Sequence, residues 1–181
     1  LPDPRKGCRL RKLVVSGNQW SGFVPGFQAC DSLETIDLSS NYFTGVSDLS
    51  HLQNLTFLEL TNNHIPKFLE NDWNLSSLQY LGLSNTGLSG LFAAVLQMPM
   101  LQTLDISDNM LLGEVPSFNK YEKLERLILG SNYFTRAGDL SHLRYLSYLD
   151  LSSNHIPSFL TLTMNLSALK ELNLCDTGLV G

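Results

Sequence analysis

One short pattern recurs along the chain and constrains its fold more than any other feature of the sequence. The pattern is L-x-x-L-x-L-x-x-N-x-L, in which another apolar residue sometimes replaces a leucine. Matching segments begin at Leu10, Leu33, Leu55, Leu78, Leu101, Leu124, Leu146 and Leu169. The interval is 22 or 23 residues throughout. A regular interval of this length is typical of a solenoid, in which each repeat forms one turn and stacks on the next.

The L-x-L centre of each repeat alternates apolar and exposed residues, which is the period of a β-strand. One strand per repeat, stacked at about 4.8 Å, forms a parallel sheet whose leucines build a continuous core. The asparagine can bond the backbone as the chain turns away from the strand. Thr86 and Thr177 replace it in two repeats. A threonine offers a single hydroxyl, so we expect these two turns to be less well tied.

A longer period overlies the short one. The pattern starts at 10, 33, 55 and 78 recur at 101, 124, 146 and 169, each 91 residues later. Asn41-Tyr42-Phe43-Thr44 returns as residues 132–135, and His64-Ile65-Pro66 returns as residues 155–157. A block of four repeats is therefore duplicated. We predict one solenoid of eight repeats over residues 1–181, without terminal caps. We expect it to be an excerpt of a longer protein.

Two segments, Gly22-Phe23-Val24-Pro25 and Gly113-Glu114-Val115-Pro116, fit G-x-[IVL]-P. With the 22–23 residue spacing, they resemble the plant-specific class of leucine-rich repeat. The resemblance implies an α/β solenoid with a curved parallel sheet on its concave face. It also implies short helical turns and a partial second strand on the convex side. Repeats 2 and 6 lack the segment, and repeats 3 and 7 keep a proline without the glycine. We therefore expect the second sheet to be interrupted.

Residues 85–90, 97–109 and 111–118 are similar to the extracellular domains of plant receptor-like proteins and receptor-like kinases of cell-surface immunity. This resemblance implies an ectodomain at the plasma membrane surface that senses a peptide, protein or glycan in defence or development. It would signal through a co-receptor kinase. No run of about 18 apolar residues is present. Contact with the membrane would therefore come only through segments outside this sequence.

Glycosylation signals agree with the secretory pathway. N-x-[ST] triplets begin at Asn54, Asn74 and Asn165. Asn54 lies next to the core Leu55, which leaves less room for a sugar there, and such triplets also arise from the repeat itself. Cys8 and Cys30 fall two and three residues before successive strand leucines. The rung spacing of about 4.8 Å allows a disulfide between them. Two free thiols remain the alternative.

Exposed strand residues should form columns across the concave face. The middle column contains four acids, and aromatic residues flank it. The candidate ligand-binding residues are Asp37, Phe57, Glu59, Tyr80, Asp105, Tyr148 and Asp150. An acidic face with aromatic anchors could hold a basic or mixed peptide. The alternative is that aspartate in L-D-L-S is a habit of the repeat that keeps the sheet soluble. Phe57 and Tyr80 on adjacent strands are therefore the better candidates.

Several functions are disfavoured. A net charge of −5 argues against nucleic-acid binding, which needs a basic face. No nucleophile elbow, P-loop, dinucleotide-binding or zinc-protease motif occurs, so we predict no enzyme and no cofactor. The histidines form two pairs related by the duplication, and each pair is separated by about 19 Å at strand spacing. Neither pair can share a metal ion, and we predict no metal site.

Three alternatives to a receptor ectodomain remain. A soluble secreted inhibitor of a cell-wall-degrading enzyme would have uniform repeats, whereas this chain has a 91-residue superperiod. An ice-binding or structural repeat protein would present a flat array of threonines, whereas the exposed columns here are mixed. A cytosolic scaffold conflicts with the G-x-[IVL]-P segments of the secreted plant class.

Overall fold

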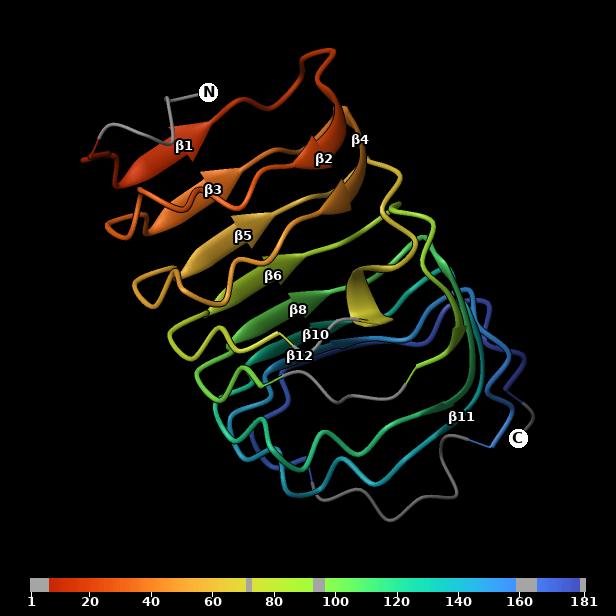
Figure 1. Ribbon diagram of the computed structural model, residues 1–181. Helices are drawn as coiled ribbons and strands as arrows, with labels where there is room; N and C mark the ends of the chain where they lie inside the picture. The colour runs from red at the N-terminus through yellow and green to blue at the C-terminus, as the bar shows by residue number, and fades with distance from the viewer. Residues whose placement is uncertain (1–6, 71–72, 93–96, 159–165, 180–181) are drawn as a thin grey trace.

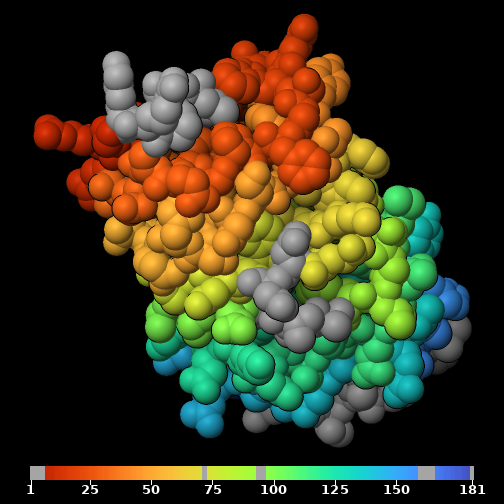
Figure 2. All heavy atoms as spheres, viewed as in Figure 1, coloured from red at the N-terminus to blue at the C-terminus, as the bar shows by residue number. Residues whose placement is uncertain are grey.

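The computed structural model describes residues 7–70, 73–92, 97–158 and 166–179. Each turn of the chain contributes one short strand to a parallel sheet of order β1-β3-β5-β6-β8-β10-β12-β13 (Figure 1). These strands are β1 (Lys12–Val14), β3 (Thr35–Asp37), β5 (Phe57–Glu59), β6 (Tyr80–Gly82), β8 (Thr103–Asp105), β10 (Arg126–Ile128), β12 (Tyr148–Asp150) and β13 (Glu171–Asn173). The predicted solenoid is confirmed. In a space-filling view the turns follow one another as bands from the N-terminal to the C-terminal end (Figure 2).

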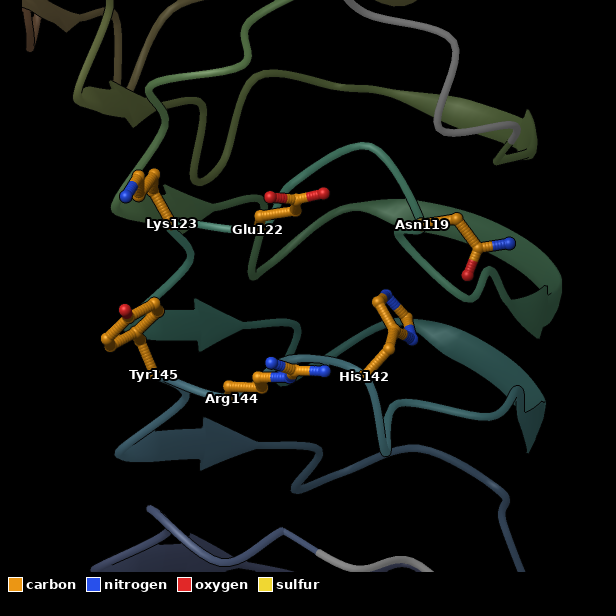
Figure 3. Close-up of a pocket in the computed structure, with 6 residues that line it drawn as sticks. All are labelled: Asn119, Glu122, Lys123, His142, Arg144 and Tyr145. Carbon is orange, nitrogen blue, oxygen red and sulfur yellow. The ribbon is translucent and has the colours of Figure 1, made fainter.

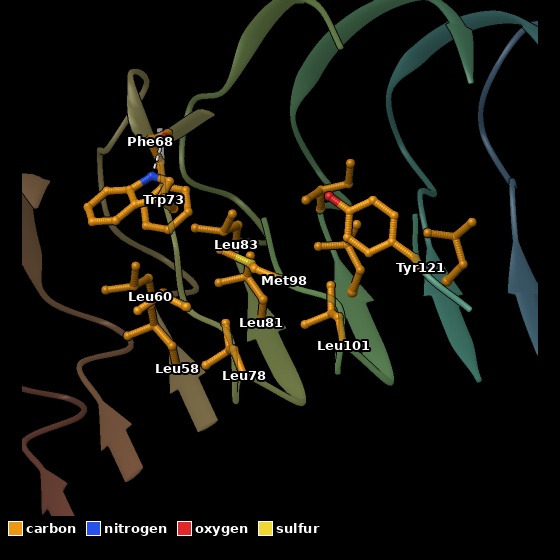
Figure 4. Packing of buried hydrophobic residues seen from close by; sticks show 14 of the residues in the cluster. Leu58, Leu60, Phe68, Trp73, Leu78, Leu81, Leu83, Met98, Leu101 and Tyr121 are labelled. Carbon is orange, nitrogen blue, oxygen red and sulfur yellow. Dashed lines mark hydrogen bonds between the residues drawn. The ribbon is translucent and has the colours of Figure 1, made fainter. Parts of the chain in front are cut away.

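The strand leucines line up in register and form the core. Leu58 pairs with Leu81, and Leu81 pairs with Leu104. All three side chains are at most 1% exposed. Figure 4 shows leucines of successive turns packed side by side, with Trp73 and Phe68 closing one end of the group. Burying one leucine stabilises the fold by about 1.5–3 kcal/mol. Six successive strands, from β3 to β12 in the sheet, bury an apolar residue at their centre, and this repetition fixes the register of the sheet.

The asparagines tie neighbouring turns together. Asn63 donates from Nδ2 to the carbonyls of Leu38 and Leu60, and its Oδ1 accepts the N–H of Phe43. Thr86 donates its hydroxyl to Leu83 in its own turn, and the following asparagine also lies within reach of that hydroxyl. Within the described chain, the Thr86 hydroxyl reaches no carbonyl of the preceding turn. The expected loss of side-chain ties is therefore observed.

The backbone compensates at the threonine positions. The N–H of Ile65 donates to the carbonyl oxygen of Thr86, and the N–H of Ile156 donates to that of Thr177. In other turns, the equivalent N–H group donates to the side-chain oxygen of an asparagine in the next turn. The two backbone bonds take the place of that side-chain bond. The threonine turns therefore have fewer side-chain bonds without leaving those buried N–H groups unpaired.

Two short sheets cover part of the convex side. β2 (Ser21–Val24) pairs with β4 (Tyr42–Val46), and β9 (Met110–Val115) lies between β7 (Ser89–Leu91) and β11 (Tyr133–Ala137). The predicted interruption is present. The interruption expected at repeats 2 and 6 was wrong, because these two repeats form β4 and β11 without the G-x-[IVL]-P segment. The described parts of repeats 3 and 7 contain no second strand.

The position of proline explains this difference. Pro66 follows Asn63 by three residues, and the equivalent residue after Asn41 is Thr44, inside β4. Proline has no N–H to donate and is disfavoured within a strand. In repeat 1 the proline, Pro25, comes only after β2 has ended. Repeat 3 instead forms the 3-10 helix η1 (Phe68–Glu70), the one helical turn within the described residues.

Candidate ligand-binding surface

The concave sheet brings five of the seven candidate residues onto neighbouring strands. Phe57 pairs with Tyr80 and Glu59 with Gly82, while Gly82 pairs with Asp105 on the next strand. Asp37 pairs with Glu59 from the other side. These four strands, β3, β5, β6 and β8, are consecutive in the sheet. We refer to Asp37, Phe57, Glu59, Tyr80 and Asp105 as the central cluster.

Phe57 and Tyr80 form the aromatic part of the central cluster. Their ring centroids are 4.3 Å apart and their planes differ by 10°, so the rings stack. Stacked pairs of this kind contribute about 0.5–1.5 kcal/mol beyond the area they bury. Both side chains are half-buried, which leaves ring surface facing the concave side. The pair therefore provides a rigid apolar platform.

Glu59 is fixed beside this platform. Its Oε2 accepts the hydroxyl of Tyr80 at 2.6 Å, and its Oε1 accepts the N–H of Thr61 at 2.9 Å. The carboxylate lies across Gly82, where a Cβ atom would collide with Glu59 Oε1. Glycine in β6 is therefore what allows the glutamate to reach the tyrosine. This interaction was not predicted from the sequence.

Burial and negative charge shift the ionisation of the cluster. Burial, and then the hydrogen bond to Glu59, raise the pKa of Tyr80 far above its ordinary value. Burial also raises the pKa of Asp105, and the nearby Glu59 and Asp108 add to the rise, while hydrogen bonds from Ser107 oppose it. A cationic side chain placed here would relieve the repulsion between these carboxylates.

The aspartates of the middle column share one local geometry. Asp37, Asp105 and Asp150 each accept on Oδ1 the N–H and the hydroxyl of the serine two residues later. The aspartate and the serine two residues later thus close a small turn at the ends of β3, β8 and β12. This favours the structural interpretation of the aspartates, and it leaves one carboxylate oxygen, Oδ2, pointing away from that turn.

Tyr148 and Asp150 form a separate group on β12, two strands beyond β8. Arg126 of β10 lies over the Tyr148 ring, with its guanidinium carbon 3.9 Å from the centroid. Asn173 donates to the second oxygen of Asp150. The concave face therefore carries two groups of candidates, and Arg126 was not among the residues predicted from the sequence.

A hollow opens at the side of the solenoid, next to the N-terminal ends of β10 and β12 (Figure 3). Its volume is about 420 Å³. It is lined by Asn119, Glu122, Lys123, His142, Arg144 and Tyr145. We call it the lateral hollow. None of its residues was predicted from the sequence to bind a ligand, because loop residues follow no hydrophobic period.

The glycosylation triplets differ in their surroundings. Asn54 is exposed, but its Nδ2 donates to the carbonyl of Asp31. Asn74 is also exposed, and its backbone N–H faces the hydroxyl of Ser50. Asn165 lies outside the described residues. Attachment of a sugar at each of the three asparagines remains a prediction.

The structure joins Cys8 and Cys30 in a disulfide between successive turns, with their Cα atoms 4.6 Å apart. Within the described chain, no group of three or more histidine, cysteine, aspartate or glutamate residues could hold a metal ion. A search of the same residues found no helix long and apolar enough to cross a membrane.

Known proteins resemble this chain in sequence and in structure. The family model described as "Leucine rich repeat" matches residues 8–65, and a second Leucine Rich Repeat model matches residues 100–120. Receptor-like protein 54 of Arabidopsis thaliana is 33% identical over 180 residues. That alignment covers 93% of this chain and 22% of the relative.

Two solved plant receptors share the fold. The peptide hormone receptor RGFR1, in complex with RGF2, is 27% identical with a TM-score of 0.73, over 91% of this chain and 28% of that chain. The ectodomain of the Arabidopsis receptor kinase HAESA, in complex with an IDA peptide hormone, is 29% identical with a TM-score of 0.67. The match covers 89% of this chain and 28% of the HAESA chain. The chain thus spans between a fifth and a third of each of these three proteins. It is a leucine-rich-repeat solenoid of the plant type, similar in sequence to plant receptor-like proteins and in structure to plant receptor ectodomains.

Proposed function

We propose that this chain is a ligand-binding segment of a plant cell-surface receptor and that its concave sheet recognises a peptide or protein. Its sequence similarity is to a receptor-like protein, and both solved receptors described above hold a peptide hormone. The solenoid is a fold of binding modules, and a binding role needs no catalytic group. A co-receptor kinase is the expected signalling partner, in defence or development.

The central cluster carries the proposal. A flat aromatic platform, Phe57 and Tyr80, lies beside the carboxylates of Glu59 and Asp105. Aromatic residues often dominate the binding energy of an interface, and a carboxylate near them selects a partner of positive charge. Glu59 is held in place before a ligand arrives, so little conformational entropy is lost on binding. We therefore expect a ligand that presents an apolar side chain beside a lysine or arginine.

A random peptide library displayed on phage tests this proposal with the whole gene product, expressed in plant cells, as the target. We expect peptides that combine a basic residue with an aromatic or aliphatic residue. Tyr80→Ala should weaken the binding of their synthetic versions by at least about tenfold, as removal of a central aromatic anchor does. Glu59→Gln should weaken basic peptides more than peptides in which glutamine replaces the basic residue.

Tyr133→Ala is the matched control, because Tyr133 is an exposed tyrosine on the convex side. It should leave binding unchanged. Equal losses in Tyr80→Ala and Tyr133→Ala would contradict a concave site. Selection of peptides without basic residues would contradict the role of the carboxylates.

Location is tested separately by intact mass before and after enzymatic removal of N-glycans. A mass decrease mapped to Asn74 and Asn165 would support passage through the secretory pathway. An unglycosylated product retained in the cytosol would contradict both the receptor and the secreted-inhibitor interpretations.

A further inference from the structure

The lateral hollow lies outside the concave face and is formed by two successive loops. Asn119, Glu122 and Lys123 come from the loop before β10, and His142, Arg144 and Tyr145 come from the loop before β12. Figure 3 shows the six side chains arranged around the space between these loops. The hollow therefore belongs to the second four-repeat block, at the side of the solenoid.

The first block provides an internal comparison for this hollow, because each residue of the hollow has a counterpart 91 positions earlier. In and next to the two loops of the hollow, four cations of the second block replace neutral residues of the first. The pairs are Ala29 and Lys120, Ser32 and Lys123, Thr35 and Arg126, and Gln53 and Arg144. The acidic positions are kept, with Asp31 matching Glu122 and Glu34 matching Glu125. The two loops that form the hollow are thus more positive than their counterparts in the first block.

The cations of the hollow have no acidic partner in the described chain. Arg144 is exposed, and neither Arg144 nor Lys123 has a carboxylate oxygen within ion-pair distance among the described residues. Lys123 lies over the ring of Tyr145, with Nζ 5.6 Å from the centroid. Cations that no carboxylate of the protein neutralises are free to bind an anionic group.

His142 adds an unpaired polar atom to one wall. Its Nε2 is buried and has no hydrogen-bond partner among the described residues. Its counterpart His51 places Nε2 3.4 Å from the carbonyl oxygen of Phe27. The two histidines occupy equivalent positions, so the loops around the second one have changed more than the histidine itself.

We propose that the lateral hollow is a second binding surface, which accepts an acidic side chain of a partner protein between Lys123 and Arg144. Tyr145, 56% exposed, provides the apolar contact, and tyrosine and arginine are enriched at protein interfaces. Glu122 remains beside the cations, so a repeating polyanion such as a uronate polysaccharide would meet a like charge. A protein segment of mixed charge avoids that repulsion. This proposal does not depend on the ligand of the central cluster.

The same displayed peptide library tests the proposal on the whole gene product. We expect a second pool of peptides containing aspartate or glutamate. Lys123→Ser combined with Arg144→Gln restores the residues of the first block, which the same fold already accommodates, and should weaken this pool at least about tenfold. Exposed ion pairs are screened by salt, so affinity should also fall between low and physiological ionic strength. Tyr80→Ala should leave the acidic pool unaffected.

The matched control is Arg9→Gln combined with Lys12→Ser, which removes the same charge from the opposite end of the sheet and should not change binding. Equal losses in the two double variants would mean that only net charge matters, and would overturn the proposal. Absence of an acidic pool would overturn it as well. A uronate oligomer that binds the hollow more tightly than the acidic peptides would replace the protein partner with a polysaccharide. Absence of basic peptides alone from the selection would contradict the proposed concave site and would not contradict the proposed lateral site.

Discussion

The two four-repeat blocks have the same core but different surfaces. Residues 91 positions apart agree at buried places, such as Leu58 and Leu149, both 0% exposed. They differ at exposed places and also at some buried ones, such as Cys30 and Tyr121, both 2% exposed. The first block holds the disulfide and the triplet at Asn54, while the second has Tyr121 and Tyr145 at the corresponding positions. Packing in the solenoid core restricts which residues can change. Residues of the loops and of the concave columns can change without disturbing that packing, so a binding surface can differ there.

The largest predicted effect tests the shared core. Leu58→Ala and Leu149→Ala should each destabilise the protein by about 2–5 kcal/mol, because both delete a fully buried side chain in an equivalent strand. Urea unfolding of the whole gene product measures both. If the two losses of unfolding free energy differ by more than about 1.5 kcal/mol, the equivalent strands are not equivalently packed. That result would contradict the statement that the two blocks share one core.

The disulfide distinguishes the blocks more sharply. Cys8→Ser or Cys30→Ser should cost about 3 kcal/mol, because the bond closes a loop of 22 residues and restricts the unfolded chain. Unfolding with and without reductant gives the measurement. The reductant should lower the stability of the wild type and leave either variant unchanged. An equal effect of reductant on wild type and variant would exclude a contribution from this bond.

Transfer of the residues of the lateral hollow to the first block tests the comparison further. Ser32→Lys, Gln53→Arg and Asn54→Tyr would give the first block the cations and the tyrosine of the lateral hollow. Because the backbone follows the same repeat, we expect this variant to bind a second equivalent of an acidic peptide selected on the wild type. Isothermal titration calorimetry would count the sites. An unchanged stoichiometry would show that the shape of the loops, and not their charges, makes the hollow.

Sequence alone predicted the features that repeat. The strict leucine interval fixed the strands and their register, since a shift by one residue would place leucines in solvent. It did not predict the bond between Tyr80 and Glu59, which depends on the missing Cβ of Gly82 in the next strand. The convex strands β4 and β11 were not expected, because a motif was used where the position of proline decides. The residues of the lateral hollow follow no sequence period, although a comparison of the two blocks position by position identifies its cations.

The smallest predicted effect concerns Asp105, whose counterpart in the first block is Val14. Burial raises the pKa of Asp105, so the folded protein binds its proton more tightly than the unfolded chain does. Stability from this group is therefore fully present below the unfolded pKa, about 3.9, and is lost as pH rises through the folded value. Asp105→Asn should remove that decline from a plot of unfolding free energy against pH.

Asp139 provides a control of opposite sign. Hydrogen bonds from Ser141 lower the pKa of Asp139, so its contribution is present above the unfolded pKa and is lost as pH falls through the folded value. Asp139→Asn should therefore flatten the acidic limb of the same curve. Its counterpart Asp48 has a pKa lowered in the same way by Ser50, so the first block should show the same acidic limb. A decline above pH 4 that survives in Asp105→Asn would contradict the assignment of this decline to Asp105.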